Sequence, residues 1–271
     1  MRFAPFALAL LVACSGAPPQ APPSHDVHAY ASRELLRKAN HGRDVEGPDG
    51  RYVLPPGVRR VWIDVGAHLL ETTRAEIERN DDVALVAIEP LEECWTTWPD
   101  DPQLIALPVA ISLERGFMDF NVNNENATSS LLPSVEGNSA AKYTKTVRVI
   151  KVPVLRLEDV LERIPAGVEV EYIKTDVQGH DLQVLKSAGD QIRRVEKVQV
   201  EIINEHIYEG KGELRPGTEP EFVAYMDSQG FRFAEDSAVQ RDRRWLDKIF
   251  VNPERQSWRE RARARFGNWV P

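Results

Sequence analysis

Cysteine is scarce in this chain of 271 residues, because Cys14 and Cys94 are the only two. Positive charge is scarce as well: 34 lysines and arginines stand against 42 aspartates and glutamates, which gives a formal net charge of -8 at pH 7. Neutralising phosphates requires a basic face, so this balance argues against a nucleic-acid partner.

What the chain does have is a globular composition, with 42% hydrophobic and 28% charged residues. After an N-terminal leader is set aside, the remaining length suits one α/β domain with a sizeable core. We place that domain at residues 61–252, with a covering segment at residues 28–60 before it. Residues 253–271 are predicted to form a basic amphipathic helix packed on the domain, with docking on a membrane surface as the alternative.

The N-terminus has the pattern of a bacterial export signal. Met1-Arg2 precedes an apolar run at residues 3–13 that is too short to cross a bilayer as a helix. The sequence Leu11-Val12-Ala13-Cys14 resembles the lipobox of lipoproteins. This predicts a signal peptide at residues 1–13, lipidation of Cys14, a Pro-rich tether at residues 14–27 and attachment to the membrane of the cell envelope. A cytoplasmic protein is the alternative. Cys94 would then be the only thiol, which excludes an intramolecular disulfide.

Residues 61–90 organise the rest of the chain. An apolar strand reaches Asp64 and breaks at Gly66, residues 71–79 have a helical pattern, and a second apolar run at residues 83–88 ends on Glu89. This is a βαβ unit. The turn after its first strand presents backbone N–H groups, and the acid at the end of its second strand is placed to accept ribose hydroxyls. An ordinary βαβ unit with a solvated Glu89 is the alternative.

A second informative stretch is residues 170–189, where a strand ends on Asp176 and Gly179 precedes a helix with one apolar face. The carboxyl ends of strands line the ligand crevice of an open α/β sheet. Asp64, Glu89 and Asp176 are therefore expected to converge there. His180 is a candidate for proton transfer, with a locally packed histidine as the alternative.

The other elements fit the same α/β pattern. Residues 123–145, rich in Asn, Ser and Thr, predict a long loop that forms a lid or substrate wall, in which Ser129 and Ser130 are candidate contacts, with a mobile surface excursion as the alternative. Glu201, near the end of a strand at residues 197–203, is a candidate for the acceptor wall. The remaining predictions are strands at residues 104–111, 117–122 and 147–154, helices at residues 157–164 and 219–229, and a closing hairpin of residues 231–233 with residues 249–251.

Five blocks resemble the FkbM-type family of S-adenosylmethionine-dependent methyltransferases, in order and over residues 61–252. They are Asp64-Val65-Gly66-Ala67, Glu89-Pro90, Ser129-Ser130-Leu131, residues 173–182 and residues 247–252.

The resemblance implies a class I methyltransferase fold, which is a doubly wound, mostly parallel, seven-stranded sheet with helices on both faces. It implies S-adenosylmethionine held by Asp64, Gly66, Ala67, His68 and Glu89. It also implies methylation of a hydroxyl oxygen on a sugar or other small metabolite. His68 stands where the family usually has Asn, and Leu70 where it usually has Gly, so the bulk of Leu70 is expected to crowd the methionine part of the cofactor.

Methyl transfer from a sulfonium needs alignment and a group that takes the acceptor proton, for which Asp176 and His180 are the candidates. No second ligand at a recognisable spacing supports a metal at Asp176. Two alternatives to an active O-methyltransferase stay open. One is a binding module that has lost catalysis, favoured by Leu70 and by export away from the cofactor, and the other is a different nucleotide-dependent enzyme. The sequence indicates a small-molecule or glycan acceptor and does not indicate an oligomeric state.

Overall fold

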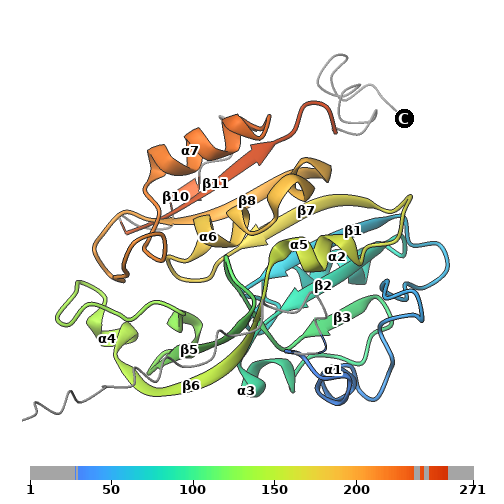
Figure 1. Ribbon diagram of the computed structural model, residues 1–271, viewed down its shortest axis with the longest axis horizontal. Helices are drawn as coiled ribbons and strands as arrows, with labels where there is room; N and C mark the ends of the chain where they lie inside the picture. Colours follow the sequence, from blue (N-terminus) through green and yellow to red (C-terminus); the bar gives the residue numbers. More distant parts are fainter. Residues whose placement is uncertain (1–27, 29, 235–238, 241–243, 256–271) are drawn as a thin grey trace, which may run out of the picture.

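A computed structural model describes residues 28, 30–234, 239–240 and 244–255 of the chain (Figure 1). The predicted signal peptide, Cys14, the tether and most of the basic tail lie outside these residues. Within the described part, no helix has the length and apolar character needed to cross a membrane.

One mostly parallel sheet forms the centre of the molecule. In spatial order its strands are β10 (Val239–Gln240), β11 (Trp245–Val251), β8 (Val195–Ile203), β7 (Glu169–Thr175), β1 (Arg60–Val65), β2 (Val83–Ile88) and β3 (Leu104–Leu107), with the short β9 (Arg232–Phe233) on β11. The strands from β8 to β3 run parallel to one another, whereas β11 pairs antiparallel with β8. The predicted seven-stranded sheet is confirmed.

Both faces of this sheet are buried, as the unbroken apolar sequence of β2 requires. Ala84, Val86 and Ile88 join the core under α5 (Leu157–Glu162), α6 (Asp181–Lys186) and α7 (Glu219–Ser228), together with the connecting helix η3 (Gly189–Arg194). The alternate residues Leu85 and Ala87 join a second core with α2 (Arg74–Arg79) and α3 (Glu92–Trp95). The sheet is therefore doubly wound, and the helices of both faces leave its strand ends open.

A second, three-stranded sheet stands beside the first. It contains β4 (Ala110–Ile111), β6 (Thr146–Leu155) and β5 (Gly116–Asn123) in that order. The single strand predicted at residues 104–111 is wrong, because Pro108, which has no N–H to give to a ladder, separates β3 from β4. β4 then leaves the main sheet and pairs with β6.

The edge strand β3 is covered by the start of the described chain, where α1 (Arg33–Ala39) packs. The side chain of Asn40 accepts a hydrogen bond from the backbone N–H of Ala106 and donates to its carbonyl, each at 2.8 Å. The Asn40 side chain thus pairs with the backbone N–H and C=O of Ala106, to which an additional strand would otherwise bind, and this protects the edge of the sheet.

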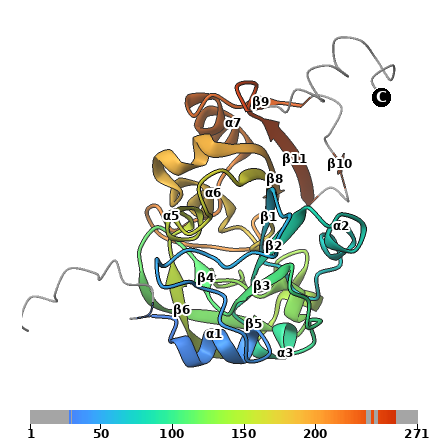
Figure 2. The same cartoon turned by 90° about the vertical axis from the view of Figure 1, so that its right-hand side faces the viewer.

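The loop at residues 123–145 is ordered by short helices, η2 (Asn126–Thr128) and α4 (Ala141–Thr144), and by a bridge from Ser134 to Tyr208. Figure 2 shows the second sheet at one end of the molecule and α7 at the other.

Candidate active site

A pocket opens where strands β1, β2 and β7 end, and the second sheet and η2 close it from the other side. The empty space between its walls, counted together with the solvent at its mouth, is about 520 Å³. The sheet order reverses at this place, because the chain runs from β1 to β2 and β3 in one direction and from β7 to β8 in the other. Ligands of open α/β sheets bind at such a switch point.

The turn after β1 has room for glycine only. Gly66 has a φ of +82°, and a Cβ there would lie 2.1 Å from the backbone oxygen of Asp176, which follows the neighbouring strand β7. The backbone N–H groups of Gly66 and Ala67 both donate to Ile88. The turn after β1 therefore contacts the ends of both neighbouring strands, β2 and β7, and its backbone forms part of the pocket wall.

His68 and Leu70 also have left-handed backbones, with φ of +44° and +64°. These are the positions where the family pattern carries Asn and Gly, the residues that adopt this conformation most readily. The expected crowding by Leu70 is wrong. Its side chain is 1% exposed and packs in the core with Ile77 and Trp95, whereas it is not among the pocket-lining residues. The departure from glycine therefore strains the backbone by about 1–2 kcal/mol and leaves the pocket open.

Glu89 lies in the middle of the pocket, immediately after β2, and only 6% of it is exposed. One carboxylate oxygen accepts the N–H of His68 at 3.1 Å and the other accepts the N–H of Leu91 at 2.9 Å. Burial raises the pKa of Glu89 to about 7, although both N–H groups favour the ionised form. Each oxygen keeps a second lone pair with which to accept a ligand hydroxyl.

Asp64 is placed at the same end of the sheet but behind the pocket wall, 1% exposed. It accepts hydrogen bonds from Thr73 at 2.7 Å and from Lys174 at 3.3 Å. Burial raises the pKa of Asp64, and the Lys174 ammonium opposes that rise. Its role is to hold Lys174, whose Nζ also lies 3.4 Å from a carboxylate oxygen of Asp176.

Asp176 lines the pocket directly after β7, with its side chain 18% exposed. Lys174 faces one of its oxygens, and the side-chain amide of Gln178 donates to the other at 2.9 Å. The carboxylate is therefore fixed from behind while it remains accessible to a ligand.

His180 lines the opposite part of the pocket and is 1% exposed. Its Nε2 lies 2.9 Å from the hydroxyl of Ser112, and within the described residues its Nδ1 has no hydrogen-bond partner. Burial lowers the pKa of His180 to about 4. The imidazole is therefore neutral at pH 7. Its 1% exposure, against 18% for the Asp176 side chain, favours Asp176 as the residue that a substrate hydroxyl can reach.

Ser129, Ser130 and Glu201 were the polar residues predicted from the sequence to contact the substrate, and the structure places only Ser129 in the pocket. The Ser130 hydroxyl donates to the Gln178 carbonyl at 2.9 Å and accepts the N–H of Leu132, so it ties the loop to the Asp176 turn. Glu201, 4% exposed, receives the Gln178 amide at 2.8 Å behind the wall. Ala67 is likewise buried in the core.

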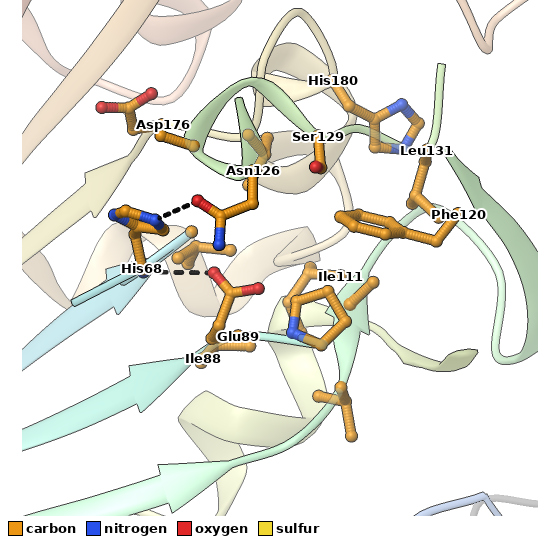
Figure 3. A pocket seen from close by; sticks show the side chains of 17 residues that line it. His68, Ile88, Glu89, Ile111, Phe120, Asn126, Ser129, Leu131, Asp176 and His180 are labelled. Carbon is orange, nitrogen blue, oxygen red and sulfur yellow. Dashed lines mark hydrogen bonds between the residues drawn. The ribbon is translucent and has the colours of Figure 1, made fainter. Parts of the chain in front are cut away.

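Sequence reasoning missed Asn126, Phe120 and Ile111, which complete the pocket (Figure 3). The side-chain oxygen of Asn126 lies 2.9 Å from Nε2 of His68, so η2 is tied to the turn after β1. In the sequence, the feature that could have identified Asn126 was its position three residues before the candidate residue Ser129. Nothing in a single sequence indicated that Phe120 would reach the pocket from a second sheet.

The pocket has two chemically different ends with Glu89 between them. Figure 3 shows His68 and Asp176 on one side of Glu89, and His180, Leu131, Phe120 and Ile111 on the other. One end is polar, with the carboxyl group of Asp176 and the imidazole of His68, and the other is apolar around the neutral imidazole of His180.

The family model described as the methyltransferase FkbM domain matches residues 64–233. The chain belongs to this family of methyltransferases. The match includes Glu89, Asp176 and the loop between them, and it argues against a different nucleotide-dependent enzyme. No curated protein matches the chain.

Solved structures with similar folds include a fibrillarin/Nop5p complex, with 12% identity, a TM-score of 0.38, and coverage of 75% of this chain and 77% of that one. A magnesium protoporphyrin IX methyltransferase from Synechocystis PCC 6803 with bound SAM has 8% identity, a TM-score of 0.37, and coverage of 73% and 71%. The antibiotic-resistance methyltransferase Kmr has 11% identity, a TM-score of 0.35, and coverage of 73% and 89%. Similarity this low does not indicate a substrate.

Proposed function

We propose that this protein uses S-adenosylmethionine to methylate a hydroxyl oxygen on a sugar or another small metabolite. The observation that carries the proposal is the position of Glu89, between a polar end and an apolar end of one pocket in a chain of the FkbM methyltransferase family. A ligand with an amino-acid group, a ribose and a flat base matches this order of polar end, Glu89 and apolar end.

The residues present fit this cofactor. Gly66 keeps the turn free of side chain, Glu89 offers acceptor lone pairs to ribose hydroxyls, and the apolar surfaces of Ile111 and Phe120 suit an adenine ring. His68 and Asp176 border the polar end. When bound, S-adenosylmethionine supplies a methyl group on a sulfonium, which is already activated for displacement.

The chain's own part in the reaction is to align the acceptor and receive its proton. Apart from Glu89, Asp176 carries the only carboxyl group among the lining residues of the described pocket. Lys174 and Gln178 hold its carboxylate still, which lowers the entropy lost in aligning a hydroxyl against it.

Glu89→Ala is expected to weaken binding of S-adenosylhomocysteine about 10- to 100-fold, or about 1–3 kcal/mol, because ribose hydroxyls lose a charged acceptor. Isothermal titration calorimetry measures this. Glu93→Ala removes an exposed carboxylate from the same segment and is the matched control, expected to bind as the parent does. Equal affinity of Glu89→Ala and the parent would contradict the ribose assignment.

The same residue predicts the pH dependence of binding. The hydroxyls are accepted by the ionised carboxylate, and the pKa of Glu89 lies at about 7. Affinity should therefore be full above pH 7 and fall as pH drops through 7, by up to about tenfold per pH unit. In Glu89→Ala this dependence should be absent.

We further propose that the protein is a lipoprotein of the cell envelope, anchored through Cys14. The support is the Leu11-Val12-Ala13-Cys14 pattern behind a short apolar run. Cys14→Ser should move the protein from the membrane fraction to the soluble fraction, which immunoblotting of fractionated cells measures, whereas Cys94→Ser should leave it membrane-bound. An unchanged membrane fraction for Cys14→Ser would contradict the anchor.

A further inference from the structure

The outer face of the β5–β6 pair carries apolar side chains where solvent is expected. Phe117, Val147 and Val149 are 54%, 59% and 55% exposed, and Tyr143, just before β6, is 42% exposed. We call these four residues the ribbon face. An antiparallel pair with one covered side normally presents polar residues on the other. Val147 and Val149 lie towards the start of β6, and Phe117 lies on β5 beyond the Asp119–Lys151 pair. Exposed apolar side chains along one face mark an interaction surface.

These four side chains are not part of the hydrophobic core. The strands contribute to the core with the side chains on their opposite side. Phe120, Val122 and Val152 pack together under the ribbon, and Phe120 continues into the pocket. Val149 lies opposite Asn121 in the ladder. Asn121 follows the inward-pointing Phe120, so the side chains of Asn121 and Val149 point to the outer side of the strands.

The segment that contains β6 is basic although the whole chain is acidic, and Asp119 on β5 is the acid on the same outer side. Residues 138–157 contain five basic residues and no acid, in a chain whose formal net charge is -8. Arg148 pairs with Glu93, and Lys151 pairs with Asp119. Lys142, over the ring of Tyr143 at 5.3 Å, and Lys145 add positive charge beside the apolar side chains. Apolar residues bordered by lysines suit an anionic lipid surface.

The described chain also starts at this face. The ring of Tyr30 packs edge-on against Phe117, with 6.2 Å between the centroids. Cys14 precedes Tyr30 by 16 residues. A lipid at Cys14 would therefore be attached within about 55 Å of the ribbon face, the reach of a fully extended tether. Figure 1 shows β5 and β6 at the end of the molecule away from α7, so α7 would stay clear of a surface under the ribbon.

We propose that the ribbon face docks on a bilayer that contains anionic phospholipid. The pocket wall formed by Phe120 lies on the reverse side of the docked strands, so the active site is held close to the membrane.

The test places a fluorophore that reports polarity at the face. In full-length Cys14→Ser, which removes the anchor, Val149→Cys is labelled while the buried Cys94 is spared. Addition of phosphatidylglycerol–phosphatidylcholine vesicles should shift the emission to shorter wavelength. The matched control is a label at Val53→Cys, since Val53 is 53% exposed and lies outside the ribbon, and it should show no shift.

Replacement of Phe117, Val147 and Val149 by serine should lower the vesicle partition coefficient of the Cys14→Ser protein about tenfold, since each loses buried apolar area. Circular dichroism confirms that this variant is folded. Equal shifts at residues 149 and 53, or an unchanged partition coefficient, would overturn the proposal. So would a shift at residue 149 that grows with protein concentration without vesicles, which would identify a second copy of the chain as the occupant.

Discussion

Gly66→Ala is expected to lower the free energy of unfolding by about 3 kcal/mol or more, because nothing at this position can move aside. The new Cβ would stand 2.1 Å from the Asp176 oxygen and 2.9 Å from its carbonyl carbon, both of them backbone atoms. Strands β1 and β7 are hydrogen-bonded neighbours there, so relief requires the strand ends to separate. Any folded molecules would have a displaced turn, and binding of S-adenosylhomocysteine should fall about a hundredfold.

The control separates this clash from the backbone strain. Gly42 has nearly the same φ, +86°, and a Cβ there meets nothing within 4 Å. Gly42→Ala should therefore destabilise by only about 1 kcal/mol and leave binding unchanged. Urea denaturation measures both variants. If Gly66→Ala were as stable as Gly42→Ala, the turn and β7 would not be in contact as described.

Asp176→Asn is expected to reduce methyl transfer about a hundredfold or more while the protein still binds S-adenosylhomocysteine. Asparagine keeps the shape of the side chain and an oxygen for Gln178, but it has no charge with which to take the acceptor proton. The measurement is transfer of labelled methyl from S-adenosylmethionine to a hydroxyl acceptor found by screening sugars and small metabolites.

Asp119→Asn is the matched control, because Asp119 is an exposed carboxylate on the outer side of β5, paired with Lys151. It should transfer methyl groups at the parental rate. Unchanged transfer in Asp176→Asn would show that another group receives the proton. A methyl group found on nitrogen would contradict the hydroxyl acceptor and leave the family assignment intact.

The acids at the strand ends were predictable from sequence, because parallel strands bring their carboxyl ends to one edge whatever their spacing in the chain. Glu89 and Asp176 follow β2 and β7 and meet in the pocket. The direction in which the Asp64 side chain points was not predictable. Asp64 is a residue of β1 itself, whereas Glu89 and Asp176 follow their strands. The pleat of β1 turns the Asp64 side chain towards Thr73 and away from the pocket.

Leu70 shows a different limit of sequence reasoning. The pattern correctly indicated a position that favours glycine, because the backbone there is left-handed. Whether the added side chain blocks a ligand depends on where its Cβ points, and the surrounding core with Ile77 and Trp95 decides that. The sequence-based argument for a module that has lost its cofactor therefore loses its main support.

The second sheet accounts for most of what was missed at the site. Strands were predicted at residues 117–122 and 147–154, but strand content alone does not say which strands pair. Phe120 reaches the pocket only because β5 and β6 pair apart from the main sheet and fold over its end. Asn126 and Ser129 then enter the wall on the loop that follows β5.

Binding of S-adenosylmethionine in this pocket can be tested by a calorimetric titration of the purified chain with S-adenosylhomocysteine above pH 7. We predict saturable binding of one ligand per chain with a dissociation constant on the order of micromolar, which corresponds to about 8 kcal/mol. We also predict that Leu70→Gly does not bind more tightly than the parent. Absence of heat in the parent, with binding restored by Leu70→Gly, would contradict an open pocket. Absence of binding in both would contradict the cofactor assignment itself.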